Sequence, residues 1–204
     1  MCHEPRHSHV TLGSMRLFAA VLPPTAAADE LATEVAALKR LPAAESLRWT
    51  GHAGWHFTLA FMGEVDDERV PDLQARLARA AHRTASFPLR LHRGGRFGHR
   101  ALWIGAAGGI EQMRLLAERA DAAARRAGVA MEEHRRYQAH LTIARTRDAG
   151  GDLRPYVEAL GAFEGTPWQV GELALVRSNL PVGGVRGEQP RYEVVGSWSL
   201  EGAG

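Results

Sequence analysis

The sequence predicts an α+β protein built from antiparallel strands with helices on their outer faces. Its strand-like and helical segments do not alternate strictly, as they would in a doubly wound parallel sheet. Each half of the chain presents strands, one copy of a short motif and a helix, which predicts two similar lobes that face each other across a cleft. With 204 residues, the chain is long enough for one sizeable core and short for two independent ones.

The start of the chain is expected to lie outside the fold. Residues 1–14 show no apolar periodicity, so we expect them to form a disordered extension. Residues 15–204 then form a single bilobal domain. The regular pattern begins at a second methionine, Met15, and the sequence leaves open whether translation starts there or at Met1.

The first half of the domain begins with a buried strand and a helix. Pro23 and Pro24 end the strand and suit the first turn of a helix, whose apolar residues recur at helical spacing. Asp66 and Asp67 place negative charge at the N-terminus of a second helix, where the helix dipole favours it. The predicted elements are strands Arg16–Leu22, Leu47–Trp49 and Trp55–Met62, helix Thr25–Leu41, a helix opening at Asp66, and strands Phe87–Leu91 and Ala101–Gly105 joined by a Gly- and Arg-rich loop, Arg93–Arg100.

The second half repeats this plan. Ile110–Ala127 has helical periodicity and Gly128 is a natural stop for it. A strand then carries the second copy of the motif, and Asp152–Leu160 predicts a short helix. Two closing strands, near Gln169–Arg177 and Tyr192–Leu200, flank a Gly/Pro-rich loop.

The repeated motif is a tetrapeptide, His-apolar-Thr-apolar, found at His56–Leu59 and His140–Ile143. In a strand, alternate side chains share a face, so each histidine and threonine project together while the two apolar residues enter the core. A lone strand histidine is usually structural, but chance gives no reason for the repeat. The candidate catalytic residues are therefore His56, Thr58, His140 and Thr142.

These four side chains suit the cleavage of a phosphodiester. One neutral and one charged imidazole can remove and supply a proton, and hydroxyls can donate to the non-bridging oxygens as charge develops on them. Threonine is a poor zinc ligand, and the sequence contains no His-Glu-x-x-His or Cys-x-x-Cys. We therefore expect no catalytic metal and no cofactor.

The paired motifs resemble those of the 2H phosphoesterase superfamily, and in particular the bacterial and archaeal RNA 2′,3′-cyclic phosphodiesterases, historically called 2′-5′ RNA ligases. The similarity spans about residues 15 to 200. The chain departs from the family pattern at Gly54-Trp55, Tyr137 and Ala139, none of which is a reacting group. The matching stretches are Met15–Ala20, Leu47–Trp49, His56–Val65, Tyr137–Arg145, Leu175–Ser178 and Arg191–Val194.

The resemblance implies a bilobal 2H-phosphoesterase fold with a pseudo-twofold axis. It also implies metal-independent hydrolysis of RNA 2′,3′-cyclic phosphate ends to 2′-phosphates, with 2′-5′ RNA ligation as the reverse reaction. His140 would be the proton acceptor that activates water, and His56 the proton donor to the departing 3′ oxygen. Arg145 and Phe61, five residues after the two histidines, would be substrate-binding residues near the cleft.

The residues alone leave several of these roles open. Phe61 suits the core as well as the cleft, and Arg145 faces away from His140 unless its strand bulges. Tyr137 and Trp55 could stack on a base or pack against the sheet. The loop arginines Arg93, Arg96 and Arg100 could contact RNA or lie on a solvated hairpin.

Two other functions also stay open. The substrate could be a small cyclic nucleotide phosphate or ADP-ribose 1″,2″-cyclic phosphate. The protein could instead be a non-catalytic RNA- or nucleotide-binding module whose histidines are remnants.

Composition indicates the cellular environment that the chain suits, but it does not identify a substrate. The net charge of only +2 does not argue for broad nucleic-acid affinity, although 24 of the 25 basic residues are arginines. No apolar run approaches the ~20 residues of a membrane span, and a single cysteine, Cys2, cannot form an internal disulfide. We expect a cytoplasmic monomer with no obligate protein partner and no membrane association.

Overall fold

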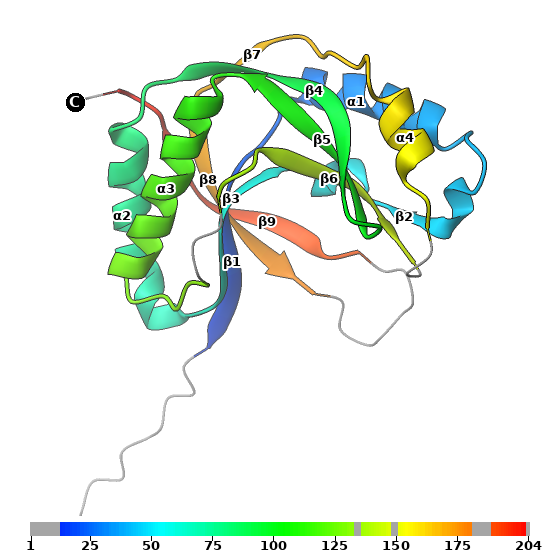
Figure 1. Ribbon diagram of the computed structural model, residues 1–204. Coiled ribbons are helices and arrows are strands. Elements are labelled where there is room, and N and C mark those ends of the chain that lie inside the picture. Colours follow the sequence, from blue (N-terminus) through cyan, green and yellow to red (C-terminus); the bar gives the residue numbers. More distant parts are fainter. Residues whose placement is uncertain (1–12, 133–135, 148–150, 181–188, 203–204) are drawn as a thin grey trace, which may run out of the picture.

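The computed structural model describes residues 13–132, 136–147, 151–180 and 189–202 as two antiparallel sheets with helices around them (Figure 1). The first sheet has the strand order β3-β1-β8-β9 and the second β2-β6-β5-β4-β7. The first sheet consists of β1 (Ser14–Val21), β3 (Phe57–Asp66), β8 (Glu172–Asn179) and β9 (Arg191–Ser199). The second consists of β2 (Leu47–Trp49), β4 (Phe87–Phe97), β5 (Ala101–Gly108), β6 (His140–Thr146) and β7 (Trp168–Val170). The predicted α+β class is confirmed.

Two helices, α1 (Thr25–Leu38) and α3 (Ile110–Arg126), each pack against a different sheet from the one that contains the preceding strand. Helices α2 (Val70–His82) and α3 lie side by side against the first sheet, whereas α1 and α4 (Arg154–Ala159) pack near β4 of the second (Figure 1). The helix that follows β1 thus lies on the other sheet, and so does the helix that follows β5. The helices that follow the two motif strands, α2 and α4, each stay with their own sheet. The lobes are similar, as expected, but each sheet is covered by one helix that follows a strand of the other sheet.

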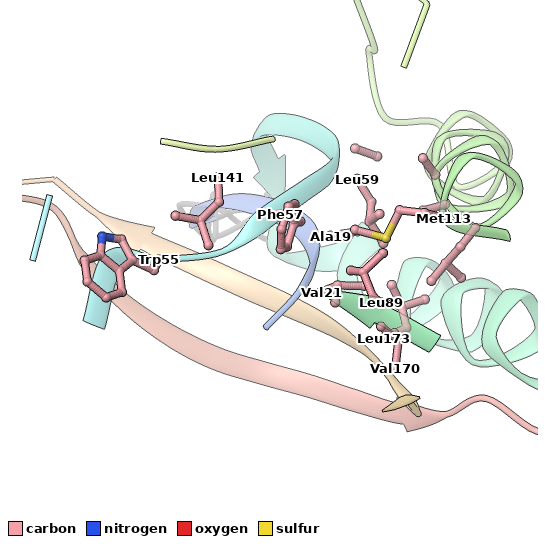
Figure 2. Packing of buried hydrophobic residues seen from close by; sticks show 14 of the residues in the cluster. Ala19, Val21, Trp55, Phe57, Leu59, Leu89, Met113, Leu141, Val170 and Leu173 are labelled. Atoms are coloured by element: carbon pink, nitrogen blue, oxygen red, sulfur yellow. The ribbon is translucent and has the colours of Figure 1, made fainter. Parts of the chain in front are cut away.

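One continuous core lies beneath both motif strands. Phe57 and Leu141 are fully buried, and Leu59 and Ile143 are buried with them in the same cluster. Figure 2 shows Phe57 and Leu141 from the two strands among these apolar side chains. The alternation predicted for the two tetrapeptides is therefore confirmed on its apolar side. No helix in the described ranges is long and apolar enough to cross a membrane.

Two segments that the sequence suggested as simple elements are built differently. The Gly- and Arg-rich stretch predicted as a loop is mostly strand, because β4 continues to Phe97 and pairs with β5 through a bulge at Arg93, whose φ is +52°. The strand predicted over Gln169–Arg177 is two strands. Val170 pairs with β4 in the second sheet, Glu172 pairs with β9 in the first, and Gly171 joins them.

The ends of two elements also differ from expectation. Strand β1 begins at Ser14, earlier than predicted, and the Ser14 hydroxyl donates to Glu64 on β3 at 3.1 Å. Helix α1 ends at Leu38, earlier than predicted, and the chain leaves it through tighter turns closed by the N–H groups of Arg40 and Leu41. The predicted disordered extension lies, for residues 1–12, outside the described residues.

Candidate active site

The two motif strands come from different sheets and meet at one cleft. Its inner part has a volume of about 160 Å³. The lining residues come from β3, β6, β9 and the segment before β3: Thr50, Gly54, His56, Thr58, His140, Thr142, Arg145 and Tyr192. The four residues singled out as catalytic candidates thus line a single space.

A wider space of about 320 Å³ shares His56, Thr58 and Arg145 with the inner part. Phe61 also lines it, 44% exposed, so this side chain lies in the cleft and not in the core. The further lining residues are Arg16, Phe18, Arg48, Trp49, Thr50, Ser178, Leu180, Gln189, Pro190 and Tyr192. The cleft therefore has an inner end with the two His-Thr pairs and an outer end rich in aromatic and basic groups.

Matching bulges explain why the residue three after each threonine faces the cleft. In β3, Thr58 pairs with Ala20 and Ala60 pairs with Ala19, so Leu59 is the extra residue. In β6, Ile143 is the extra residue between the pairs that Thr142 and Ala144 make with β5. A bulge inserts one residue and reverses the alternation beyond it. Both Phe61 and Arg145 are consequently turned toward the cleft.

The backbone just before β6 holds the His140 ring in one orientation. Its Nδ1 lies 2.8 Å from the carbonyl oxygen of Gln138, to which the Nδ1–H donates. In the neutral ring this leaves Nε2 as the acceptor. Burial lowers the pKa of His140 below its ordinary value, and the nearby charge of Arg145 lowers it further, although the bond to Gln138 opposes both. The neutral ring is therefore favoured.

His56 has the same kind of partner, the backbone of Gly54, two residues before it. Burial lowers the pKa of His56 from 6.5 to about 4, and the charge of His140 acts in the same direction. The bond to Gly54 only partly offsets this. Both rings are therefore neutral near pH 7 in the protein alone.

Aromatic rings fix both imidazoles. His56 lies 4.6 Å from the ring of Phe18 and 5.1 Å from that of Tyr192, centroid to centroid. His140 meets the edge of Phe97 at 4.8 Å and lies 6.3 Å from Trp103. These contacts restrict ring rotation and account for the burial that lowers the two pKa values.

The cleft is cationic. Arg16, Arg48 and Arg145 line it, and none of the described residues that line it is acidic. Arg16 places its guanidinium 4.8 Å from the centre of the Phe61 ring, which fixes both side chains. Arg48 and Arg145 are register partners in the β2–β6 pair and so lie side by side. Such a site attracts a small anion or a phosphate group.

Some residues named from the sequence lie elsewhere. Tyr137 is not among the residues that line the cleft; it packs against the core and borders a neighbouring space beside α3, which Phe61 also lines. Burial raises the pKa of its hydroxyl. Trp55 is buried in the core, as the packing alternative held. The loop arginines Arg93, Arg96 and Arg100 do not line the cleft either.

Sequence reasoning does not point to Arg48 or Tyr192, which line the cleft, or to Phe97, which packs against His140. Arg48 sits on a three-residue strand, and only its pairing with Arg145 reveals its position. Tyr192 and Phe97 come from segments far from either motif. No group of three or more His, Cys, Asp or Glu side chains in the described ranges is placed to hold a metal ion.

The chain matches the family model of the 2′-5′ RNA ligase superfamily over residues 22–180. It is 30% identical over 163 residues to an RNA 2′,3′-cyclic phosphodiesterase of Geobacillus stearothermophilus. That alignment covers 76% of this chain and 48% of the relative, so the chain spans about half the length of the curated relative it matches.

Solved structures resemble the fold over nearly its whole length. Escherichia coli LigT in apo form superposes with a TM-score of 0.71 at 25% identity, covering 92% of this chain and 98% of LigT. LigT complexed with 3′-AMP gives a TM-score of 0.72 at 25% identity with the same coverage. A Thermus thermophilus protein gives 0.72 at 27% identity, covering 93% of this chain and all of that one.

Proposed function

The chain belongs to the 2′-5′ RNA ligase superfamily, and on this premise we propose that it hydrolyses 2′,3′-cyclic phosphate ends of RNA to 2′-phosphates without a metal ion. The observation that carries the proposal is the convergence of two His-Thr pairs on one cationic cleft. A monoester or diester phosphate fits between two such pairs, because each pair offers one proton-transfer group and one hydroxyl.

His140 acts as the general base. Its Nδ1–H is committed to the Gln138 carbonyl, so Nε2 takes the proton of the attacking water while the water oxygen bonds to phosphorus. His56 acts as the general acid and protonates the 3′ oxygen as the bond between phosphorus and that oxygen breaks. The product carries a 2′-phosphate and a free 3′-hydroxyl. If the 5′-hydroxyl of a second RNA takes the place of water, the same steps give a 2′-5′ phosphodiester and a free 3′-hydroxyl.

Thr58, Thr142 and Arg145 stabilise the charge that grows on the non-bridging oxygens. Each threonine is two residues after its histidine, and both hydroxyls line the inner part of the cleft. Donors fixed before the reaction need no reorganisation when the charge develops, which is the source of their effect. A bound phosphate anion also offsets the burial that keeps His56 neutral, and so restores the proton that the acid needs.

The outer end of the cleft favours an RNA end over an isolated cyclic phosphate. Phe61 and Trp49 offer ring faces, and Arg16 and Arg48 offer guanidinium groups beyond the inner space. A nucleotide preceding the cyclic end could stack on such rings and pair its phosphate with such cations. The relative named an RNA 2′,3′-cyclic phosphodiesterase supports this choice, and the LigT complex with 3′-AMP supports a nucleotide as the ligand.

The test compares two substrates in the presence of EDTA: a short RNA with a 2′,3′-cyclic end and a 2′,3′-cyclic mononucleotide. We expect turnover of both, a higher kcat/KM for the RNA, and the 2′-phosphate as sole product by phosphorus NMR. A dominant 3′-phosphate would reverse the assigned positions of His56 and His140. Equal kcat/KM values would point to a small cyclic nucleotide as substrate, and absence of turnover would leave a binding module.

A further inference from the structure

A second cationic groove lies between α2 and α3, away from the cleft. Its volume is about 460 Å³ and it shares no residue with the cleft. Its walls are five arginines and one glutamate, and its floor is alanine, with Leu115 exposed at its margin. The lining residues are Arg76, Arg79, Ala80, Arg83, Leu115, Glu118, Arg119, Ala122, Ala123 and Arg126. Five arginines against one glutamate give a net charge of +4, whereas the whole chain carries +2.

The arginines form two rows that face each other. Arg76, Arg79 and Arg83 follow one another along α2 and its C-cap, and Arg119 and Arg126 do so on α3. The ends of each row are seven residues apart, which is about 10 Å along a helix. Each row is therefore long enough to contact more than one phosphate of the same strand.

The acidic residues of these helices are already engaged. Glu111 and Glu118 both pair with Arg114, and Asp121 pairs with Arg125. Within the groove, Arg76 pairs with Asp72. No described carboxylate forms an ion pair with the three exposed arginines, Arg79, Arg83 and Arg126. Of the charged residues that line the groove, Arg76 and Glu118 are therefore paired, whereas the other four arginines form no ion pair with a described carboxylate.

Arg119 is fixed in place at the centre of the groove. Its Nη1 donates to the carbonyl oxygen of Arg83 and to the hydroxyl of Thr84, both at 2.7 Å. Thr84 is itself buried, 3% exposed, and donates to the carbonyl oxygen of Ala80. The remaining edge of the guanidinium is held by no described residue. A guanidinium oriented in advance loses less side-chain entropy when it binds a phosphate.

We propose that this groove, defined by Arg76, Arg79, Arg83, Arg119 and Arg126, binds the phosphate backbone of RNA remote from the end that enters the cleft. Arginine matches the geometry of phosphate, and a groove between two cationic rows suits a strand better than a flat contact does. A membrane-binding surface usually exposes aromatic side chains. None of the residues that line this groove is aromatic. The inference rests on the proposed function only for the choice of RNA.

The test measures binding separately from catalysis. The probe is a fluorescent RNA of about 20 nucleotides with an ordinary 3′-hydroxyl end, titrated by anisotropy between about 50 and 200 mM salt. The variant is Arg79→Gln/Arg83→Gln/Arg126→Gln, whose three side chains are exposed. We expect its Kd for RNA to rise about tenfold or more at low salt, and the salt slope to fall by about 2 for single-stranded RNA.

A control variant, Arg40→Gln/Arg90→Gln/Arg154→Gln, removes the same number of positive charges outside the groove, although Arg90 and Arg154 are paired with Glu164 and Asp152. This control should bind RNA within about twofold of the wild type, and both variants should hydrolyse a 2′,3′-cyclic mononucleotide at the wild-type rate. Wild-type affinity in the groove variant, or equal weakening in the control, overturns the inference. The inference is also overturned if the protein binds anionic vesicles or polyglutamate through the groove but does not bind RNA.

The two proposals fail separately in this design. Groove-dependent binding of the 3′-hydroxyl RNA, without turnover of any cyclic phosphate, would refute the proposed function and leave the groove assignment standing. Turnover without groove-dependent binding would do the reverse.

Discussion

The depressed pKa values of the two cleft histidines make a quantitative prediction. His56 has a pKa of about 4 against 6.5 for an ordinary imidazole. At pH 6.5 only about one His56 ring in 300 then carries a proton in the free protein. The productive form needs His56 protonated and His140 neutral. Because both pKa values are lowered, kcat/KM, which reports the free enzyme, should peak on the acid side of pH 6.5.

Binding of the substrate should move the profile. A phosphate anion in the cleft favours the charged form of each imidazole and so raises both pKa values. The profile of kcat, which reports the bound state, should therefore lie at higher pH than the profile of kcat/KM. Initial rates of 2′,3′-cyclic mononucleotide hydrolysis across the acidic and neutral range measure both curves. The limbs belong to the pair of histidines and not to either one.

NMR titration of the imidazoles assigns the individual values. The signals are identified with His56→Gln and His140→Gln, and inorganic phosphate serves as the anion. Arg145→Met should raise the pKa of His140, because the Arg145 charge is one cause of its depression. Arg48→Met removes a charge from the same cleft that is not among those causes, and is the matched control. A free-protein His56 that titrates near 6.5, or a His140 unmoved in Arg145→Met, would refute the reasoning.

The remaining predictions concern the other cleft residues. His56→Ala and His140→Ala should each reduce hydrolysis by at least about a hundredfold while the protein stays folded, and near-normal turnover in either variant would remove the two-histidine mechanism. Thr58→Ala and Thr142→Ala should lower kcat more than they raise KM, since their hydroxyls serve charge present mainly in the transition state; a change in KM alone would make them binding residues only. Phe61→Leu should raise KM for RNA ends about three- to tenfold with little effect on a cyclic mononucleotide, and equal effects on both would argue against stacking.

The sequence was informative wherever a local rule decides the outcome. Alternation alone placed Phe57 and Leu141 in the core and their neighbouring histidines on the opposite face. The bulges lie beyond this rule, because an inserted residue is defined only by the partner strand. In β6 the sequence carries a trace of the bulge, because two apolar residues, Ile143 and Ala144, separate Thr142 from the charged Arg145. In β3 four apolar residues, Leu59 to Met62, follow Thr58, so the sequence does not mark Phe61.

The long-range errors have a different cause. The stretch Arg93–Arg100 has the composition of a loop, yet it is mostly strand because β5 supplies a partner for it. The chain divides at Gly171 because β7 pairs with β4 in one sheet and β8 pairs with β1 and β9 in the other, and no local pattern records these partners. Arg48 and Tyr192 reach the cleft by tertiary placement alone, and a single sequence carries no signal for it.

The placement of α1 and α3 has a consequence for how the protein can move and unfold. Since α1 follows a strand of the first sheet but packs near the second, and α3 does the opposite, neither sheet can separate from the other without stripping away a helix that covers it. Wide hinge opening would therefore disrupt the core, and small adjustments of side chains are the cheaper way to admit a substrate. Half of the chain, expressed by itself, would leave both sheets incomplete, because each sheet takes strands from both halves, and should not fold. His56 and His140 are thus brought into the cleft, and lost from it, in one cooperative folding transition.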